Sequence, residues 1–395
     1  MSVQISTAVV DVRESMNALP RFLQPFLTWL SCKPLSEERP WRLTPFHHLA
    51  SSAGSLVGGA ALGVLAVTLS GFALLLLPVA WLLTIHGVRK LRSVVVHQCA
   101  HSNFLKNQAL NDLIGETISI VTFTQNYAPY KREHISGHHS TKHMTVEDPT
   151  VAFLLRMIGA RAGMSRQELW ALMRARLLSP AFHLKFLRIR LISNFKEASV
   201  GHVVGMFVFW GSLITVTVYT GAWLQLTFAW LLPLTIPLHM VECLRLSGKH
   251  VFPDRDLQKR GRQELGSFTH GIFVGERVPD ASLPFFRRMF AWGGWWLRLC
   301  FYHLPSRMLV LVGDAPCHDY HHRRPKSKDW PNYIFARQKE VVSPPADWPP
   351  YTEVWGVAAA IDETFRSLSA ADPALYEVKA TELVTEWELL EALEE

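Results

Sequence analysis

The sequence predicts an all-α integral membrane protein, with about four transmembrane helices arranged as two hairpins beneath a cytoplasmic helical cap. Three observations support this fold class: only 18% of the 395 residues are charged, two long stretches carry no charge at all, and clustered histidines lie outside those stretches. A soluble domain usually has about 25% charged residues. The composition therefore disfavours both an ordinary soluble globule and a disordered chain.

The N-terminal segment, residues 1–42, is expected in the cytoplasm or at the membrane interface. It carries Asp11 and Glu14 where a secretory signal would need an apolar core. A short apolar run at 22–30 suits the membrane surface. We therefore place this segment before the membrane domain, which we assign to residues 43–335.

Two stretches without Asp, Glu, Lys or Arg, residues 43–88 and 198–241, are the predicted membrane segments. About 20 helical residues cross the roughly 30 Å hydrocarbon core, so each stretch has room for two crossings. Ser70-Gly71 divides the first stretch, and Thr220-Gly221-Ala222 divides the second. These turn residues predict two tight helical hairpins.

The charge distribution predicts the orientation of the chain. Basic residues follow the first stretch directly at Arg89, Lys90 and Arg92, whereas the turns inside both stretches are uncharged. The positive-inside rule then places both termini and the polar segments in the cytoplasm. The net charge of +7 suits a face that rests on anionic lipid, and no nucleic-acid motif is present.

The polar segments are expected to be mainly helical, at 89–103, 108–124 and 166–196. Residues 281–312 mix aromatic side chains with Arg, which is typical of an interfacial segment rather than a crossing. The remainder, 336–395, is predicted to be a cytoplasmic tail that ends in an acidic amphipathic helix.

Histidine carries the chemical signal of this sequence. Of its 18 histidines, eight fall into three compact groups: His97 and His101; His134, His138 and His139; His318, His321 and His322. All three groups follow or flank the predicted crossings on the same side of the membrane. A costly ionisable group near a membrane is a candidate functional residue by default.

The spacing within the groups favours metal binding. His97 and His101 stand at i and i+4, so both rings project from one helix face and can reach one ion. The same holds for His134 and His138, while His139 is rotated by about 100° and can turn toward a second ion. Three groups exceed the needs of one four-coordinate metal, which predicts a dinuclear site.

The motifs HQCAH at 97–101, HISGHH at 134–139 and HDYHH at 318–322 resemble the three histidine boxes of the membrane fatty acid desaturase and hydroxylase superfamily. The resemblance covers roughly residues 45–335, including the order of boxes and hairpins. EHISGHH followed by Glu147-Asp148-Pro149 is also similar to the alkane monooxygenase branch, although the first box has Gln98 where that branch has Glu.

The resemblance implies a non-haem centre of two iron ions that uses dioxygen and two supplied electrons to attack an unactivated C–H bond. It also implies a further histidine ligand between the second hairpin and the last box. His250 occupies the most similar position, ahead of His270 and His239. The implied ligands are then His97, His101, His134, His138, His139, His250, His318, His321 and His322.

A ligating imidazole needs a hydrogen-bond partner for its second ring nitrogen. Four carboxylates lie near enough in sequence to supply such partners: Glu116, Glu133, Asp148 and Asp319. Asp148 and Asp319 are preferred, while His143 is expected beside the ligands rather than among them. No catalytic side chain beyond the ligands is predicted.

Two classes of function fit these residues. The first is an oxygen-dependent di-iron enzyme that desaturates a fatty acyl chain or, on the same site, hydroxylates a fatty acid or alkane; no motif decides between the two outcomes. The second is a membrane zinc hydrolase or metal carrier. A catalytic zinc needs about three protein ligands, which would leave most box histidines unexplained.

The chain carries no flavin or nicotinamide fingerprint and no four-cysteine iron–sulfur pattern. Its electrons are therefore expected from a separate ferredoxin, rubredoxin or b-type cytochrome with its reductase. The expected partners are the membrane, a lipid or fatty acyl substrate and this donor.

Overall fold

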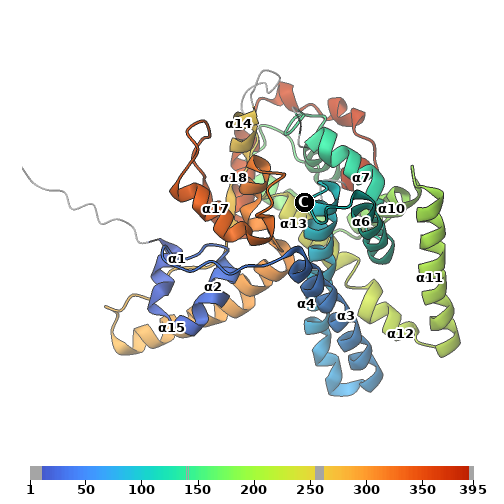
Figure 1. The fold of residues 1–395 in the computed structure, drawn as a ribbon, viewed down its shortest axis with the longest axis horizontal. Helices are drawn as coiled ribbons and strands as arrows, with labels where there is room; N and C mark the ends of the chain where they lie inside the picture. The colour runs from blue at the N-terminus through green and yellow to red at the C-terminus, as the bar shows by residue number, and fades with distance from the viewer. Residues whose placement is uncertain (1–10, 139, 141, 254–261, 391–395) are drawn as a thin grey trace, which may run out of the picture.

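The computed structural model describes residues 11–390 except His139, Thr141 and residues 254–261. Within this part of the chain, four helices are long and apolar enough to cross a membrane, and they extend from one side of a helical cap (Figure 1). They comprise Pro45–Leu69, Gly71–Ala100, Val200–Thr220 and Trp223–Leu246. The predicted fold class is confirmed.

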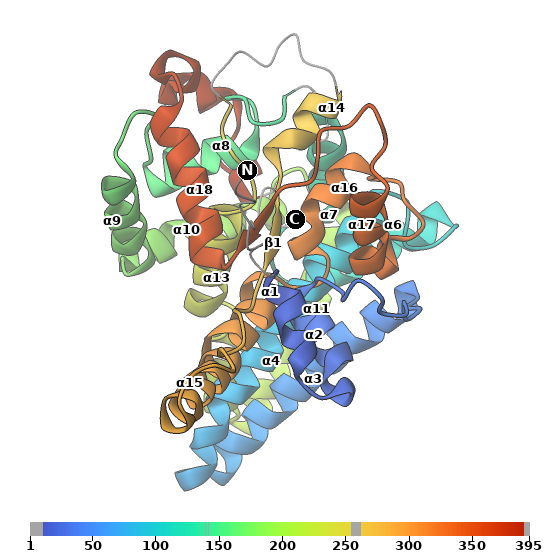
Figure 2. The same ribbon diagram turned by 90° about the vertical axis from the view of Figure 1, so that its left-hand side faces the viewer.

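The first hairpin is tightly packed, as predicted. Helix α3 (Pro45–Leu69) ends at Ser70, and Ser70 and Gly71 turn the chain with positive φ angles of 52° and 53°. A 3-10 turn then leads into α4 (Leu77–Lys90), which runs beside α3 (Figure 2). A side chain at Gly87 would overlap the backbone of Leu56, so this glycine permits the close approach.

The second crossing continues beyond its predicted end. Helix α4 passes through a π-helical turn, Leu91–Val96, into α5 (His97–Ala100), so the helix expected at 89–103 is a continuation of the crossing. The charges do not end the helix because they are satisfied inside the cap. Arg89 donates to the carbonyl of Val310, and Arg92 donates to the hydroxyl of Ser119.

The second hairpin is open rather than tight, which corrects the prediction. Its turn lies at Gly221, as expected, with φ of 69°. The first leg, α11 (Val200–Thr220), stands apart from the second in Figure 1 and packs on the cap helix α6 (Gln108–Thr122), where the Trp210 indole donates to the Ile120 carbonyl over 2.9 Å.

The second leg packs on the first hairpin instead. It consists of α12 (Trp223–Leu226), a π-helical turn (Thr227–Leu231) and α13 (Ile236–Leu246). The Trp81 indole donates to the Phe228 carbonyl over 2.7 Å. The periodicity of an apolar stretch does not reveal which neighbour each leg will choose, so the opening could not be read from sequence.

The cap is mostly helical and surrounds the histidine motifs. The expected helix at 166–196 is divided, because Ser179 caps the backbone N–H of Phe182 and Pro180 begins a new helix. A two-stranded parallel sheet, β1 (Gly271–Phe273) with β2 (Glu353–Trp355), joins distant parts of the cap. Its further helices are α7 (Tyr127–Glu133), α8 (Pro149–Phe153), α9 (Arg166–Leu177), α10 (Pro180–Phe195), α14 (Arg262–Leu265), α16 (His318–Arg323), α17 (Tyr333–Val342) and α18 (Val357–Ala370).

Two further segments flank the cap. The short helices α1 (Val12–Ser15) and α2 (Gln24–Ser31) follow each other near the N-terminus, and α15 (Phe285–Arg298) leaves the cap on the side opposite α11 (Figure 1). On α15, Phe285 and Phe290 are 67% and 74% exposed. Such exposed aromatic side chains agree with the interfacial location that the sequence predicts.

The acidic helix predicted within 336–395 is wrong. After α18 the described chain forms two 3-10 turns, Pro373–Tyr376 and Val378–Leu383, and then an irregular segment. Tyr376 is buried and its hydroxyl donates to the Met144 carbonyl over 3.1 Å. The apolar residues that suggested one face of a solvated helix instead anchor the tail to the cap.

We expect Gly87→Val to destabilise the protein by about 1–3 kcal/mol, because the new side chain must separate α3 from α4. Gly58→Val is the matched control, since a Cβ at Gly58 meets no atom within 4 Å. The shift in the unfolding midpoint, followed by tryptophan fluorescence in detergent, measures the difference. Equal midpoints for both variants would contradict the close packing of this hairpin.

Candidate metal centre

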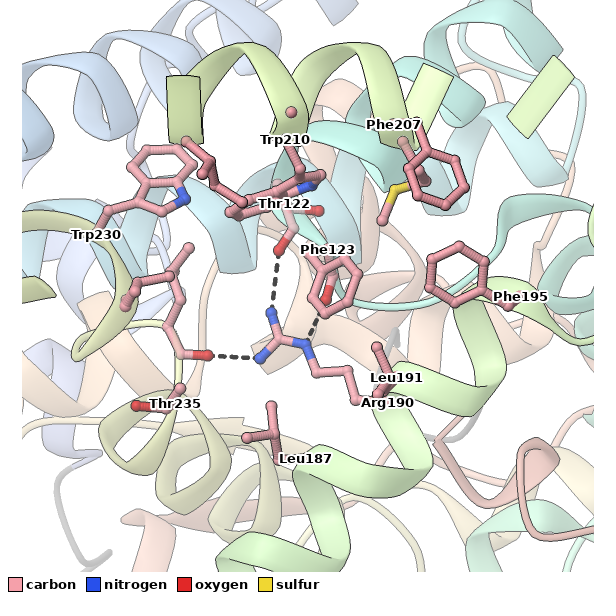
Figure 3. A pocket seen from close by; sticks show the side chains of 15 residues that line it. Thr122, Phe123, Leu187, Arg190, Leu191, Phe195, Phe207, Trp210, Trp230 and Thr235 are labelled. Carbon is pink, nitrogen blue, oxygen red and sulfur yellow. Dashed lines mark hydrogen bonds between the residues drawn. The ribbon is translucent and has the colours of Figure 1, made fainter. Parts of the chain in front are cut away.

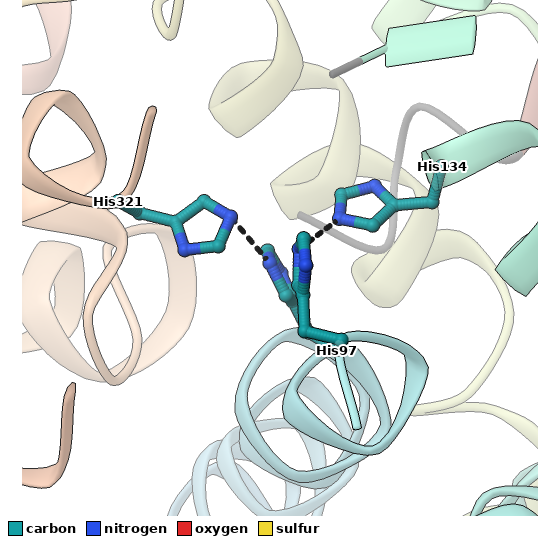
Figure 4. Close-up of side chains that lie close together, drawn as sticks. His97, His134 and His321 are labelled. Atoms are coloured by element: carbon teal, nitrogen blue, oxygen red, sulfur yellow. Dashed lines mark hydrogen bonds between the residues drawn. The ribbon is translucent and has the colours of Figure 1, made fainter. Parts of the chain in front are cut away.

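Four histidines from three separate parts of the chain form the first cluster. His97 and His101 come from α5 and its C-terminal end, His134 begins the π-helical turn after α7, and His321 lies on α16. The Nε2 atoms of His97 and His321 are 2.8 Å apart, and those of His101 and His134 are 2.9 Å apart. Figure 4 shows His134 and His321 reaching in from opposite sides above His97.

Four other histidines form the second cluster. His138 ends the π-helical turn, His250 follows α13, and His318 and His322 lie on α16. The Nε2 atom of His322 lies 3.2 Å from that of His138 and 3.1 Å from that of His318. In each cluster the potential ligand atoms all lie within 4.8 Å of one another, and all eight side chains are buried.

The histidines of one motif are shared between the two clusters. His134 and His138, which the spacing predicts to reach one ion, instead stack with their ring centroids 6.0 Å apart and face different clusters. His318 and His321 do the same at 5.9 Å. His97 with His101, and His318 with His322, are also one turn apart but do share a cluster, so the spacing alone does not decide which ring faces which cluster. The π-helical turn and α16 thus both bridge the clusters.

The three candidates for the additional histidine are now distinguished by position. His250 lies in the second cluster, and its Nδ1 atom is 3.1 Å from the hydroxyl of Thr269, which leaves Nε2 for the cluster. His270 is 3.1 Å from the carbonyl of Gly248, and His239 stacks on Phe186 at 4.0 Å; neither belongs to a cluster. The predicted ligand His139 lies outside the described residues.

Asp148 holds two histidines with one carboxylate. It is fully buried, and its Oδ2 atom is 3.5 Å from Nδ1 of His138 and 3.4 Å from Nδ1 of His143. The same oxygen accepts the backbone N–H of Met144, while Oδ1 accepts that of Thr150. Asp148 therefore lies where the sequence predicts a partner for a ligating ring.

His143 lies closer to the second cluster than the sequence suggests. Its ring centroid is 4.6 Å from those of His138 and His250 and 4.8 Å from that of His322. A cavity of about 40 Å³ beside this cluster is lined by His138, His143 and His322. That volume is sufficient for one small molecule the size of water.

Asp319 has different partners from those expected. Its carboxylate accepts hydrogen bonds of 2.8–3.0 Å from the guanidinium of Arg337 on α17, and it also accepts the N–H of Tyr320. No hydrogen bond to a box histidine is present among the described residues. Asp319 fastens α16, which carries three box histidines, to α17 and, through the bond of Arg337 to Glu353, to β2. No motif in the sequence singled out Arg337.

The electrostatics of the second cluster favour the ligand forms of these groups. Burial, together with the neighbouring His143 and His250, lowers the pKa of His322 well below its usual value, so its imidazole is neutral. Burial opposes the ionisation of Asp148, but the interactions with His138 and His143 hold its pKa well below the usual range. A neutral imidazole at His322 and an ionised carboxylate at Asp148 are the forms that binding of a divalent metal requires of these two groups.

The geometry fits two metal ions. Two nitrogen ligands at roughly 2.1 Å from one metal stand about 3.0–3.4 Å apart, which is close to the Nε2 separations of 2.8–3.2 Å. Since two neutral rings can share only one proton, a cation is the simplest common partner for four converging nitrogens. The fully histidine ligand sets suit iron, zinc or copper rather than magnesium or calcium.

Comparison with known proteins points to one family. The profile of the family named fatty acid desaturase matches residues 72–355, well over half of the chain. The chloroplastic omega-6 fatty acid desaturase of Brassica napus is 36% identical over 73 residues, and that of Arabidopsis thaliana is 34% identical over 73 residues. Each match covers 18% of this chain and 16% of the relative, so the chain matches only a small part of either relative. No solved structure matches.

We expect Asp148→Asn to weaken metal binding about 10–100-fold, because the amide cannot hold the Nδ1–H groups of two rings as a carboxylate does. Asp372→Asn is the matched control: like Asp148 it precedes a proline and caps the N–H two residues on, over 2.9 Å, but far from the clusters in sequence. Competition of a chelator for Co²⁺ measures the affinity. Unchanged affinity in Asp148→Asn would show that this carboxylate does not support a ligand.

Arg337→Met should destabilise the protein by about 3–5 kcal/mol, because it leaves the buried carboxylate of Asp319 unpaired. The paired replacement Asp319→Leu with Arg337→Met should recover much of this loss, since no buried charge remains. Arg366→Met, which breaks the exposed pair with Glu363, serves as control. The unfolding midpoint in detergent is the measurement, and a stable single variant would contradict the anchoring role.

Proposed function

This chain belongs to the fatty acid desaturase family, and on that premise we propose that it is a membrane-bound non-haem di-iron oxidoreductase that desaturates a fatty acyl chain. The observation that carries the proposal is the pair of buried four-histidine clusters at the end of four membrane-length helices. When bound there, two irons would supply the activation of dioxygen that attack on an unactivated C–H bond requires. The protein's own side chains would hold the metals and position the substrate.

The proposed ligands follow from the clusters. One iron would be held by His97, His101, His134 and His321, and the other by His138, His250, His318 and His322. His139 is retained as a ninth ligand from the resemblance of its motif. The even division of the eight described ligands favours two irons over a single catalytic zinc, which needs only about three protein ligands.

The side chains around the ligands orient and shield them. Asp148 and the Thr269 hydroxyl hold ring nitrogens that face away from the second cluster, so the opposite nitrogens stay directed inward. Burial of all eight described rings limits access of water to the site. Exclusion of water protects a reactive oxidant from side reactions while an apolar chain is held in place.

The membrane setting supports a fatty acyl substrate. The first cluster begins at the end of the crossing Gly71–Ala100, so the metal centre adjoins the surface at which lipid chains arrive. The positive-inside rule favours a cytoplasmic location for the centre and both termini. A separate ferredoxin, rubredoxin or b-type cytochrome is the proposed electron donor, for which the net positive charge of the chain is suitable.

The test is to compare the fatty acids of cells that express the wild-type chain with those of cells that express His138→Ala. We expect a product that lacks two hydrogen atoms in the wild type and its loss to background in the variant. His183→Ala is the control, because His183 is also a buried histidine but bonds the Leu177 carbonyl and belongs to neither cluster.

The other outcomes are informative as well. A His138-dependent product with an added oxygen atom would replace desaturation by hydroxylation on the same site. Absence of any such product, with verified expression, a competent electron donor and zinc rather than iron in the purified protein, would reject the oxidoreductase.

A further inference from the structure

The open second hairpin leaves a large apolar pocket between its legs. The pocket has a volume of about 510 Å³, and its walls come from α11, the π-helical turn of the second leg and α10. A neighbouring pocket of about 420 Å³ lies further along the same two legs, and Trp230 lines both. Volumes of this size are typical of ligand sites.

Both legs lie in candidate membrane-spanning helices, so these pockets face hydrocarbon rather than water. Water is not stable in an apolar cavity, and the side chains that line an empty cavity lose van der Waals contacts on that side. Each leg is nevertheless anchored to a different neighbour. Trp210 of α11 bonds to α6, and Trp81 of α4 bonds to the second leg. The legs therefore cannot close the space without breaking these anchors, and another molecule has to fill it.

The charged side chain among the residues that line the larger pocket, Arg190, is bound to the backbone. Its guanidinium donates to the carbonyls of Thr122, Phe123 and Leu234, as Figure 3 shows. The opposite walls are apolar side chains, including Phe207 and Trp230. The surface that remains open in the pocket is therefore apolar and suits a hydrocarbon chain.

One wall also offers an unused donor. The indole nitrogen of Trp230 is buried and has no hydrogen-bond partner among the described residues. A buried N–H without an acceptor is costly, and an ester or amide carbonyl of a lipid would supply one. A second copy of this chain, in contrast, would have to insert side chains into a pocket that lies between two helices of one chain.

From these observations we propose that the pocket between the legs of the second hairpin binds one acyl chain of a bilayer lipid. The lipid chain fills the space that these anchors leave between α11 and the second leg. The proposal does not depend on the reaction of the metal centre, and it concerns a lipid that enters sideways from the membrane.

Gly211 provides a direct test because it lines the pocket and a Cβ there meets no atom within 4 Å. Gly211→Phe should therefore fill the pocket without moving the backbone. Gly58→Phe is the matched control, since Gly58 is also an exposed glycine of a membrane helix with no atom within 4 Å of a Cβ. Ile214→Trp, on the same wall, is a second variant that fills the pocket.

The full chain is reconstituted in bilayers that contain a phospholipid with a photoreactive diazirine in the middle of one acyl chain. After irradiation, we expect more crosslinks on residues 206–214 and 230–235 than on the outer face of α3. These crosslinks should fall several-fold in Gly211→Phe and Ile214→Trp but not in Gly58→Phe. Metal content and elution volume verify that each variant is folded.

Three results would overturn the proposal. Crosslinks on these segments could be no more frequent than on α3, they could survive in both filled variants, or the segments could crosslink to a second copy of the chain instead of to lipid. Because the readout is a crosslink, it gives its answer whether or not the chain proves to be a desaturase.

Discussion

The structure depends on bringing eight imidazole nitrogens together in two groups of four, within 4.8 Å of one another in each group, at the end of a membrane bundle. No single segment can do this, so the donors come from α5 and its C-terminal end, the π-helical turn after α7, the loop residue His250 beyond α13, and α16. Each of these segments must then be held in register with the others. The first crossing pair, the Asp148 contacts and the Arg337–Asp319 pair all serve that requirement.

The sequence was sufficient for those features that follow from local patterns. Charge-free stretches located the four crossings, positive-φ turns formed where Ser70-Gly71 and Gly221 predicted them, and the motif spacing identified residues that the fold brings together. These inferences need only helix periodicity and hydrophobic length. The first rank of His250, in contrast, came from the resemblance of its position to that of the additional histidine in the family.

Features that depend on contacts between distant segments could not be predicted. The division of His134 and His138 between clusters depends on where α16 lies, and the partner of Asp319 comes from Arg337 on another helix. The tail from Asp372 has the composition of a solvated helix but is bound by buried Tyr376. In each case a tertiary contact outweighs the local preference.

One short helix, α16, supplies ligand atoms to both clusters, with His321 directed to one and His318 and His322 to the other. Each inserted or deleted residue would rotate the following ring by about 100°, which would direct it to the wrong cluster. Evolution can therefore exchange side chains within this helix far more easily than it can alter its length. Among homologues, gaps in an alignment should consequently avoid 318–322, even where the surrounding loops differ in size.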